Sequence, residues 1–250
     1  MRRDVPVFRP ATTTDLPMLK SLWAVCFTTD TPEDIDTFFS QIWPHAWSVI
    51  GEIGDRVVTM AHLLPASAFC DNEVLPVRYL YGGGTHPHYR GRGLYTQLLA
   101  ECAKYVANRG EYALYLHPAT ASLVPLYKQA GFQEGIGRLP AGPLTDNDVC
   151  PLTTEEYVEL RQKAIRKTSE SMVCFEPAPT VAAVFLEGLS PYSTPNGTVL
   201  LSLGERIMDI CPPPLTAPLE PVAMWLSTRA YPGLEEKMAK NGAYTALLGE

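Results

Sequence analysis

A glycine-rich turn that leads into a helix is the feature that most constrains the fold of this chain. Residues 82–84 are consecutive glycines, and Gly91 and Gly93 follow within the stretch "THPHYRGRGLYTQLL" at 85–99. Apolar residues then recur at helical spacing over 94–108, with Gly110 just past the end, which predicts a helix. The preceding "VRYLYGGGT" reads as a strand. We therefore expect a strand, a bare turn and a helix in succession.

A helix start of this kind suits the binding of phosphate groups. Its first backbone N–H groups lack partners and together carry about half a positive charge. Glycine lets the backbone approach a ligand closely and permits positive φ, and Arg90 and Arg92 add positive charge. We expect a phosphate or pyrophosphate to dock at residues 90–96. A tight strand-to-helix turn with solvated arginines is the alternative interpretation.

The common nucleotide-binding motifs do not fit this turn. No Lys-Ser/Thr pair follows the glycines, which excludes a P-loop. Thr96 stands where the dinucleotide-binding fingerprint needs glycine or alanine. A different kind of phosphate site is therefore indicated.

Several segments, taken in order, resemble the GNAT acetyltransferase superfamily over about residues 7–140. "RGRGLY" is similar to the family's pyrophosphate loop, Arg/Gln-x-x-Gly-x-Gly/Ala, with Tyr95 in place of the last glycine or alanine. "HPHYRG" resembles the usual Pro-x-Tyr-Arg-Gly approach to that loop. "LYKQAGF" at 126–132 is similar to Leu-Tyr-x-x-x-Gly-Phe, and "FRPATTTDLPML" resembles the opening strand and helix.

The resemblance implies a fold and a cosubstrate. The fold would be α/β (α+β), a mixed, largely antiparallel sheet flanked by helices, with acetyl-CoA wedged between the fourth and fifth strands. The fourth strand would end at the glycines and pair with the pantetheine arm, the turn would hold the pyrophosphate, and "YALYL" would be the fifth strand. The implied cofactor-binding residues are Gly83, Gly84, Thr85, Arg90, Gly91, Arg92, Gly93, Leu94, Tyr95 and Thr96.

Tyr127 is the implied catalytic residue. It stands where the family places the tyrosine that protonates or hydrogen-bonds the CoA sulfur. A phenol with a pKa near ~10 is protonated at neutral pH and can donate. The alternative is an ordinary core tyrosine. The family often has asparagine seven residues earlier, and Thr120 occupies that position here, which weakens the expected anchoring of the CoA arm.

The sequence does not single out a general base. Glu52 and Glu73 are candidates near the acceptor cleft, and the resemblance also allows a water wire or the terminal carboxylate of Glu250. His86 and His88 are too few for a metal site, so they are interpreted as loop residues and no metal is expected. His117 is interpreted as a strand end rather than a base.

The function implied is acetyl-CoA-dependent N-acetyl transfer, directly to a small-molecule amine or a peptide amine. One alternative is a binding module that senses CoA without turnover. Another is a structural protein whose glycine turn binds nothing. The net charge of −7 does not favour a wide basic face for nucleic acid.

The compartment follows from the cysteines and the hydropathy pattern. The six cysteines are widely spaced without a CxxC pair, which favours reduced thiols over zinc or redox motifs. No run approaches the ~20 apolar residues of a membrane span, so the expected location is the cytoplasm.

A proline-rich and glycine-rich segment at 135–152 suggests two domains, a GNAT-like domain at 1–140 and a smaller α+β C-terminal lobe at 150–250. In the lobe we expect helices near 154–167, 179–188 and 233–248 and a hairpin at "GTVLLSLGERIMDI". The lobe is either a partial GNAT-like repeat or a separate cap. Bacterial relatives use such a lobe to wall the acceptor site or to form a homodimer.

Overall fold

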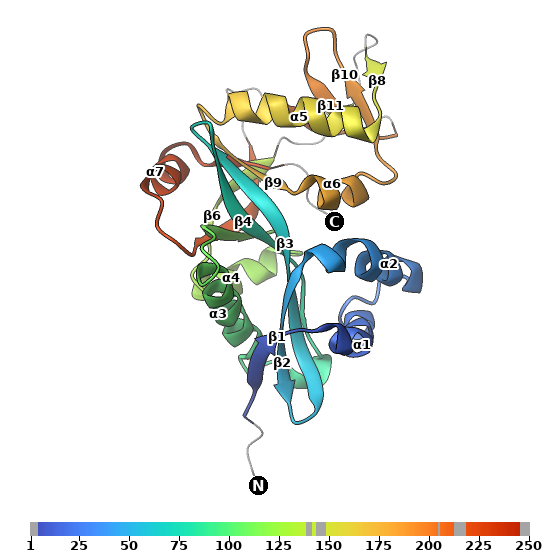
Figure 1. The fold of residues 1–250 in the computed structure, drawn as a ribbon, viewed down its shortest axis with the longest axis vertical. Coiled ribbons are helices and arrows are strands. Elements are labelled where there is room, and N and C mark those ends of the chain that lie inside the picture. The colour runs from blue at the N-terminus through green and yellow to red at the C-terminus, as the bar shows by residue number, and fades with distance from the viewer. Residues whose placement is uncertain (1–4, 139–141, 144–148, 205, 213–218, 246–250) are drawn as a thin grey trace.

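A nine-stranded sheet runs through the protein with helices on both of its faces (Figure 1). The structure, a computed structural model, describes residues 5–138, 142–143, 149–204, 206–212 and 219–245. The order of strands in this sheet is β1-β2-β3-β4-β5-β13-β6-β14-β9. Its strands are β1 (Val7–Pro10), β2 (Trp47–Ile53), β3 (Arg56–Cys70), β4 (Glu73–Thr85), β5 (Ala113–Leu116), β6 (Gln133–Arg138), β9 (Val173–Pro177), β13 (Glu220–Ser227) and β14 (Ala243–Tyr244).

Strand alternation explains why both faces are covered. Successive side chains of a strand point to opposite faces, so Met60 and Leu64 join one buried cluster while Ala61 and Leu63 join another. The helices α1 and α2 lie on the first side and α3 and α4 on the second (Figure 1). These helices are α1 (Leu16–Cys26), α2 (Pro32–Thr37), α3 (Leu94–Ala107) and α4 (Val124–Gln129).

Strands β4 and β5 diverge after a short parallel ladder. Their only paired residues are Arg78 with Leu114 and Tyr79 with Tyr115, among the residues that the structure describes. The register of β4 against β3 shifts between Met60 and His62, and such a bulge bends a strand. Gly82 adopts φ +57 there, and a Cβ on it would lie 2.4 Å from the Trp23 ring. The bend requires glycine, and it opens a space beside the last residues of β4.

The C-terminal part of the chain contributes strands to the same sheet. Strand β13 lies antiparallel between β5 and β6, and β9 pairs with residues 66–69 of β3. Residues 139–141 and 144–148, within the expected boundary, lie outside the described residues. The division into domains at 1–140 and 150–250 stays a prediction, while the sheet contains strands from both sides of it.

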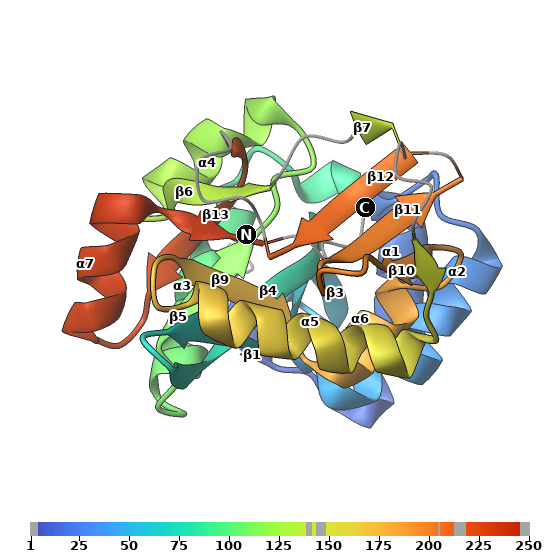
Figure 2. The same cartoon turned by 90° about the horizontal axis from the view of Figure 1, so that it is seen from above.

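A second, five-stranded sheet and three helices complete the C-terminal part (Figure 2). The sheet has the order β7-β12-β11-β10-β8. Thr153 and Glu156 form a capping box at the start of α5, which satisfies backbone N–H groups that the helix leaves unpaired. These elements are β7 (Gly142–Pro143), β8 (Cys150–Pro151), β10 (Ser190–Ser193), β11 (Val199–Leu203), β12 (Arg206–Cys211), α5 (Thr154–Thr168), α6 (Pro179–Phe185) and α7 (Pro232–Asn241).

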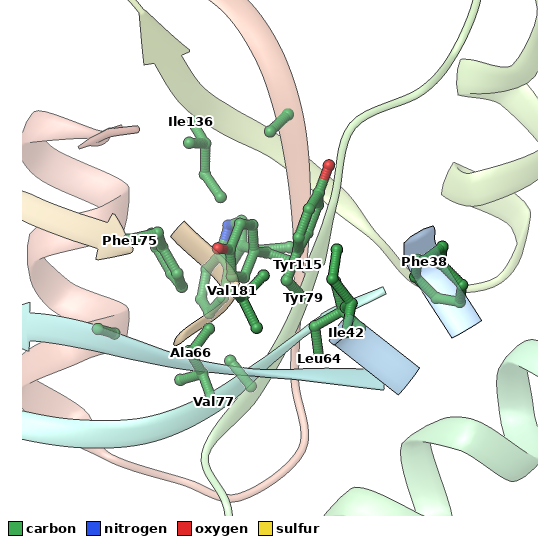
Figure 3. Packing of buried hydrophobic residues seen from close by; sticks show 14 of the residues in the cluster. Phe38, Ile42, Leu64, Ala66, Val77, Tyr79, Tyr115, Ile136, Phe175 and Val181 are labelled. Carbon is green, nitrogen blue, oxygen red and sulfur yellow. The ribbon is translucent and has the colours of Figure 1, made fainter. Parts of the chain in front are cut away.

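Aromatic and aliphatic side chains join the two parts of the chain in one core. Tyr79 and Tyr115 stack with ring centroids 4.9 Å apart, and Phe175 lies 5.0 Å from the Tyr115 ring. Figure 3 shows Val181 of α6 among these rings. Burial of such large apolar surfaces is the main stabilising contribution to a fold, so β9 and α6 pack firmly against the first part.

One local expectation from the sequence, the extent of the last helix, is wrong. The final helix ends at Asn241 rather than near 248, because Gly242 turns the backbone at φ +66 and Ala243–Tyr244 then pairs with β6 and β9. Residues 246–248 lie outside the described residues. Asp15 occupies the N-cap position of α1, but its side chain makes no capping hydrogen bond there. Its carboxylate instead accepts hydrogen bonds from the Thr12 amide at 2.7 Å and from Arg9 at 2.7 and 2.8 Å.

Candidate active site

The turn before α3 has an open backbone of the kind that binds anions. Gly91 and Gly93 adopt φ +73 and +71, and Gly93 is the N-cap of α3 with no side chain to cap it. The first amides of the helix therefore lack helical partners. Arg90 Nε donates to the carbonyl of Thr85 at 3.0 Å, which holds this guanidinium at the end of β4.

A cavity of about 460 Å³ lies against this turn. It is bounded by the end of β4 on one side and by the beginnings of α3 and α4 on the other. All the predicted cofactor-binding residues except Arg92 line it, together with Tyr127: these are Gly83, Gly84, Thr85, Arg90, Gly91, Gly93, Leu94, Tyr95 and Thr96. The fold thus brings the sequence-predicted residues to one place.

Arg92 lies on the other side of the turn. Its Nη2 donates to the carbonyl of His88 at 3.2 Å, and its guanidinium lies 5.1 Å from the Tyr89 ring centroid. It lines a neighbouring surface cavity with Arg56 and His86. The φ of +73 at Gly91 reverses the chain between the two arginines, so the side chains face different cavities.

Tyr127 and Tyr95 form a pair of phenols. Their hydroxyl oxygens are 3.3 Å apart. Burial raises the pKa of Tyr127, while its hydrogen bond with Tyr95 opposes that rise. Burial also raises the pKa of Tyr95 well above its usual value. Both phenols hold their protons at neutral pH, and so this pair can donate a proton or a hydrogen bond.

Tyr95 also lies directly over β4. A Cβ on Gly83 would approach the Tyr95 hydroxyl oxygen to 2.1 Å. Glycine at position 83 therefore permits the phenol to reach Tyr127. The family motif has glycine or alanine where Tyr95 stands, so this close approach of a side chain to β4 is a departure that the sequence shows and the structure explains.

A second cavity, of about 530 Å³, begins at the phenol pair. It extends along the splayed part of β4 towards α1 and the loop that follows α1. Trp23, Asp30, Tyr81 and His117 are among its lining residues. Five residues line both cavities, namely Phe27, Gly83, Tyr95, Leu123 and Tyr127. The two cavities therefore meet at the two phenols.

Asp30 and Trp23 line the second cavity, although the sequence indicated neither of them as a site residue. Trp23 belongs to an apolar helix stripe, which predicts core, and its ring is indeed buried. Its Nε1 nevertheless donates to Asp30 Oδ2 at 2.7 Å. The available signal was the polar run "TTD" directly after α1, but nothing in the sequence places that loop beside β4.

Three other proposed base and anchor residues, Glu52, Glu73 and Thr120, lie away from both cavities. Glu52 is paired with Arg9, with Oε1 2.5 Å from Nη2. Glu73 begins β4, at the opposite end of the strand from Thr85. Thr120 is exposed, and its hydroxyl bonds that of Ser122 at 2.7 Å. Glu250 lies outside the described residues. Glu52, Glu73 and Thr120 line neither cavity.

His62, which the sequence did not indicate as a site residue, lies in surroundings unlike those of His86 and His88. His62 is fully buried among the rings of Trp23, Phe38 and Phe39, at centroid distances of 5.1 to 5.7 Å. Its Nδ1 lies 2.7 Å from Ser48 Oγ. Burial lowers the pKa of His62 to about 3, so the imidazole is neutral across the physiological range. The rings of His86 and His88, by contrast, lie in the surface turn, 5.4 Å apart.

Comparison with protein families decides the classification. A family model described as "Acetyltransferase (GNAT) domain" matches residues 7–135, more than half of the chain. The chain belongs to the GNAT acetyltransferase family. The resemblance to this family and the mixed α/β fold with flanking helices, both expected from the sequence, are thereby confirmed.

Solved structures with the same fold cover most or all of this GNAT chain. A GCN5-related N-acetyltransferase from Kribbella flavida matches at TM-score 0.63 and 19% identity, over 82% of this chain and 58% of that one. One from Anabaena variabilis matches at TM-score 0.65 and 16% identity, over 82% and 58%. A protein from Pyrococcus horikoshii matches at TM-score 0.59 and 14% identity, over 100% and 98%. This GNAT chain thus spans under two thirds of the length of the first two.

A search of curated proteins gave no match for this GNAT chain. In the described residues, every helix is too short or too polar to cross a lipid bilayer.

Proposed function

We propose that this GNAT protein is an N-acetyltransferase that transfers the acetyl group of acetyl-CoA directly to a small-molecule amine or a peptide amine. The observation that carries the proposal is the meeting of two cavities at Tyr95 and Tyr127. One cavity lies against the bare start of α3, which suits a pyrophosphate. The other opens on the far side of the phenols and offers room for an acceptor.

The chemistry divides between the two cavities. The amides of residues 91–96 and the Arg90 guanidinium would bind the pyrophosphate of acetyl-CoA, and the end of β4 would hold its pantetheine arm. A neutral amine nitrogen attacks the thioester carbonyl carbon, the carbon–sulfur bond breaks, and the electron pair goes to sulfur. Tyr127 donates its proton to that sulfur. The new amide loses a proton to water, and Tyr127 is reprotonated from solvent.

The protein's own groups favour this division. Burial raises the pKa of Tyr127, so the phenol arrives at the transition state with its proton. Arg90 is held at the mouth of the cavity by the Thr85 carbonyl, which limits the entropy lost when it meets an anion. The six cysteines are all free, which suits a reducing compartment, and a cytoplasmic location is part of the proposal.

The test measures cosubstrate binding and turnover separately. Acetyl-CoA and desulfo-CoA should both raise the melting temperature, because both carry the pyrophosphate, whereas ATP should raise it less. Thiol release across a panel of primary amines then reports acetyl transfer. A protein that no CoA species stabilises and that releases no thiol would contradict the proposal.

Binding of CoA without turnover is a second candidate function, favoured by one observation. The Tyr95 hydroxyl lies against Gly83, where the pantetheine arm of acetyl-CoA is expected to run. Stabilisation by acetyl-CoA without thiol release for any amine would favour this candidate over transfer.

A further inference from the structure

The lining of the second cavity has the composition of an ammonium-binding site. Among the described residues that line it, six carry phenyl, phenol or indole rings, one is a carboxylate and one is the imidazole of His117, and none is lysine or arginine. Ring faces attract cations through their quadrupole, and a carboxylate adds direct charge attraction. The aromatic lining residues are Trp23, Phe27, Tyr79, Tyr81, Tyr95 and Tyr127, and the carboxylate is Asp30.

One hydrogen bond fixes the Asp30 carboxylate in place, and the carboxylate can still accept further hydrogen bonds. Trp23 Nε1 donates to its Oδ2 at 2.7 Å, which fixes the carboxylate against a buried ring. Within the part of the chain that the structure describes, its Oδ1 receives only the Thr29 hydroxyl at 3.5 Å, at the outer limit for a hydrogen bond. Among the described residues, no lysine, arginine or histidine forms an ion pair with Asp30. A half-buried carboxylate with one N–H partner is suited to receive a cation.

The negative charge acts inside the cavity. Burial raises the pKa of Tyr81 to about 12, and the charges of Asp30 and Asp34 add to this rise. Asp34 is engaged in the capping box of α2, where it accepts from the amide and hydroxyl of Thr31 at 2.8 and 2.6 Å. Asp30 is therefore the carboxylate that remains available to a ligand along this wall.

The protonation state that the reaction requires decides which nitrogen of an acceptor can lie beside Asp30. The attacking nitrogen must be neutral, because its lone pair forms the new bond to carbon. A carboxylate beside an amine stabilises the protonated form and opposes the loss of that proton. Asp30 therefore suits a cationic group that stays charged throughout the reaction, while a second nitrogen reaches the phenol pair.

We propose that the acceptor carries two basic nitrogens, one that attacks the thioester and one that remains an ammonium held by Asp30 against the aromatic wall. This inference rests on the proposed acetyl transfer and names the substrate class of the same site. An aliphatic diamine has this chemistry, since its methylene chain packs along rings while one end keeps its proton beside Asp30 and the other loses its proton to water before it attacks.

The experiment compares hexamethylenediamine with hexylamine, which has the same carbon chain and one ammonium fewer. Binding of each is measured by calorimetry on the full chain, and acetyl transfer to each is measured in parallel. We expect at least a tenfold preference for the diamine. Asp30→Asn keeps an acceptor for Trp23 but removes the charge, and it should reduce the preference to within about twofold. Asp55→Asn, at an exposed turn, should retain it.

The outcomes separate this inference from the proposed function. Equal binding of the two amines by the native protein, or a preference that survives Asp30→Asn, overturns the inference. Preferential diamine binding that Asp30→Asn abolishes, without transfer to any amine, supports the inferred cation site and overturns the proposed transfer. If Asp30→Asn does not fold, the native protein is titrated at rising ionic strength. The preference must then shrink, because salt screens charge attraction, and a salt-insensitive preference overturns the inference.

Discussion

Two polar centres of this protein combine carboxylates with aromatic rings and differ in whether a cation is built in. In the C-terminal part, Arg161 is bonded to Glu176, at 2.7 and 3.0 Å, and to Asp209. Tyr157 and Tyr244 also bond to Asp209, and this centre is closed to solvent. In the cavity beside β4, the carboxylate of Asp30 has a tryptophan N–H and no cation among the described residues.

The Arg161 centre, with its built-in cation, stabilises the fold, whereas the Asp30 centre, without one, is able to bind a cationic ligand. Burial raises the pKa of Glu176 and the Arg161 charge opposes that rise, so the arginine is what makes two buried carboxylates tolerable. A buried charge left without its partner is strongly destabilising. Asp30 avoids this cost because it is only partly buried, and water can solvate it until a ligand arrives.

Substitution of Arg161, the built-in cation, should have the largest effect on the stability of the protein. Arg161→Ala should lower the free energy of unfolding by about 3–5 kcal/mol, because Glu176 and Asp209 would be left buried without compensation. Urea unfolding followed by circular dichroism measures the loss. Lys163→Ala, in an exposed pair on the same helix and two residues from Arg161, should have little effect. Comparable effects of the two substitutions would show that the Arg161 centre is not structural.

Loss of one hydroxyl in the receptive region should affect chemistry more than binding. Tyr127→Phe should lower kcat by about 100-fold, in the range of lost acid catalysis, while the Kd for acetyl-CoA changes by less than about threefold. Stopped assays of thiol release and calorimetry give the two quantities. Tyr105→Phe, in the last turn of α3 and so at the opposite end of the helix from Tyr95, is the control. Equal losses in kcat and in affinity would argue against proton donation by Tyr127.

Acid should weaken the region beside β4 through His62. Its pKa is about 3 in the folded protein, against about 6.5 in an unfolded chain, so the unfolded state binds the proton first. Stability is therefore present above pH ~6.5 and falls as the pH drops towards 3. Between pH ~6.5 and ~5 the loss should be about 2 kcal/mol. Urea unfolding at each pH measures it, and His62→Gln should flatten this part of the profile. A variant profile as steep as the native one would contradict this assignment.

The smallest expected effect concerns two glycines in equivalent backbone conformations. Gly91 and Gly197 have φ of +73 and +83, and a Cβ on either would meet no atom within 4 Å. Either glycine-to-alanine substitution should cost about 1 kcal/mol of stability through backbone strain. Only Gly91→Ala should also weaken acetyl-CoA binding in calorimetry, because only Gly91 lies at the start of α3. Equal affinities for acetyl-CoA would indicate that the turn at 91–96 does not hold the ligand.

The sequence predicted local structure well where short-range chemistry dominates. Glycines at 82–84, 91 and 93 indicated a strand end, a bare turn and a helix start, and Leu94–Ala107 forms the helix. The helix expected near 154–167 is Thr154–Thr168 in the structure. The sequence failed at the last helix, because the apolar pattern near 243 is satisfied by strand pairing with β6 and β9, and a pairing partner that distant leaves no local signal.

The sequence by itself determined which residues surround the bare helix start, because that motif is contiguous and its backbone requirements are read from glycine positions. Only the tertiary structure decided that Arg92 faces away from Arg90, that β13 lies between β5 and β6, and that Asp30 meets Trp23 beside β4. These facts depend on long-range strand pairing and on the bend of β4, which are set by how distant apolar surfaces pack together rather than by neighbouring residues.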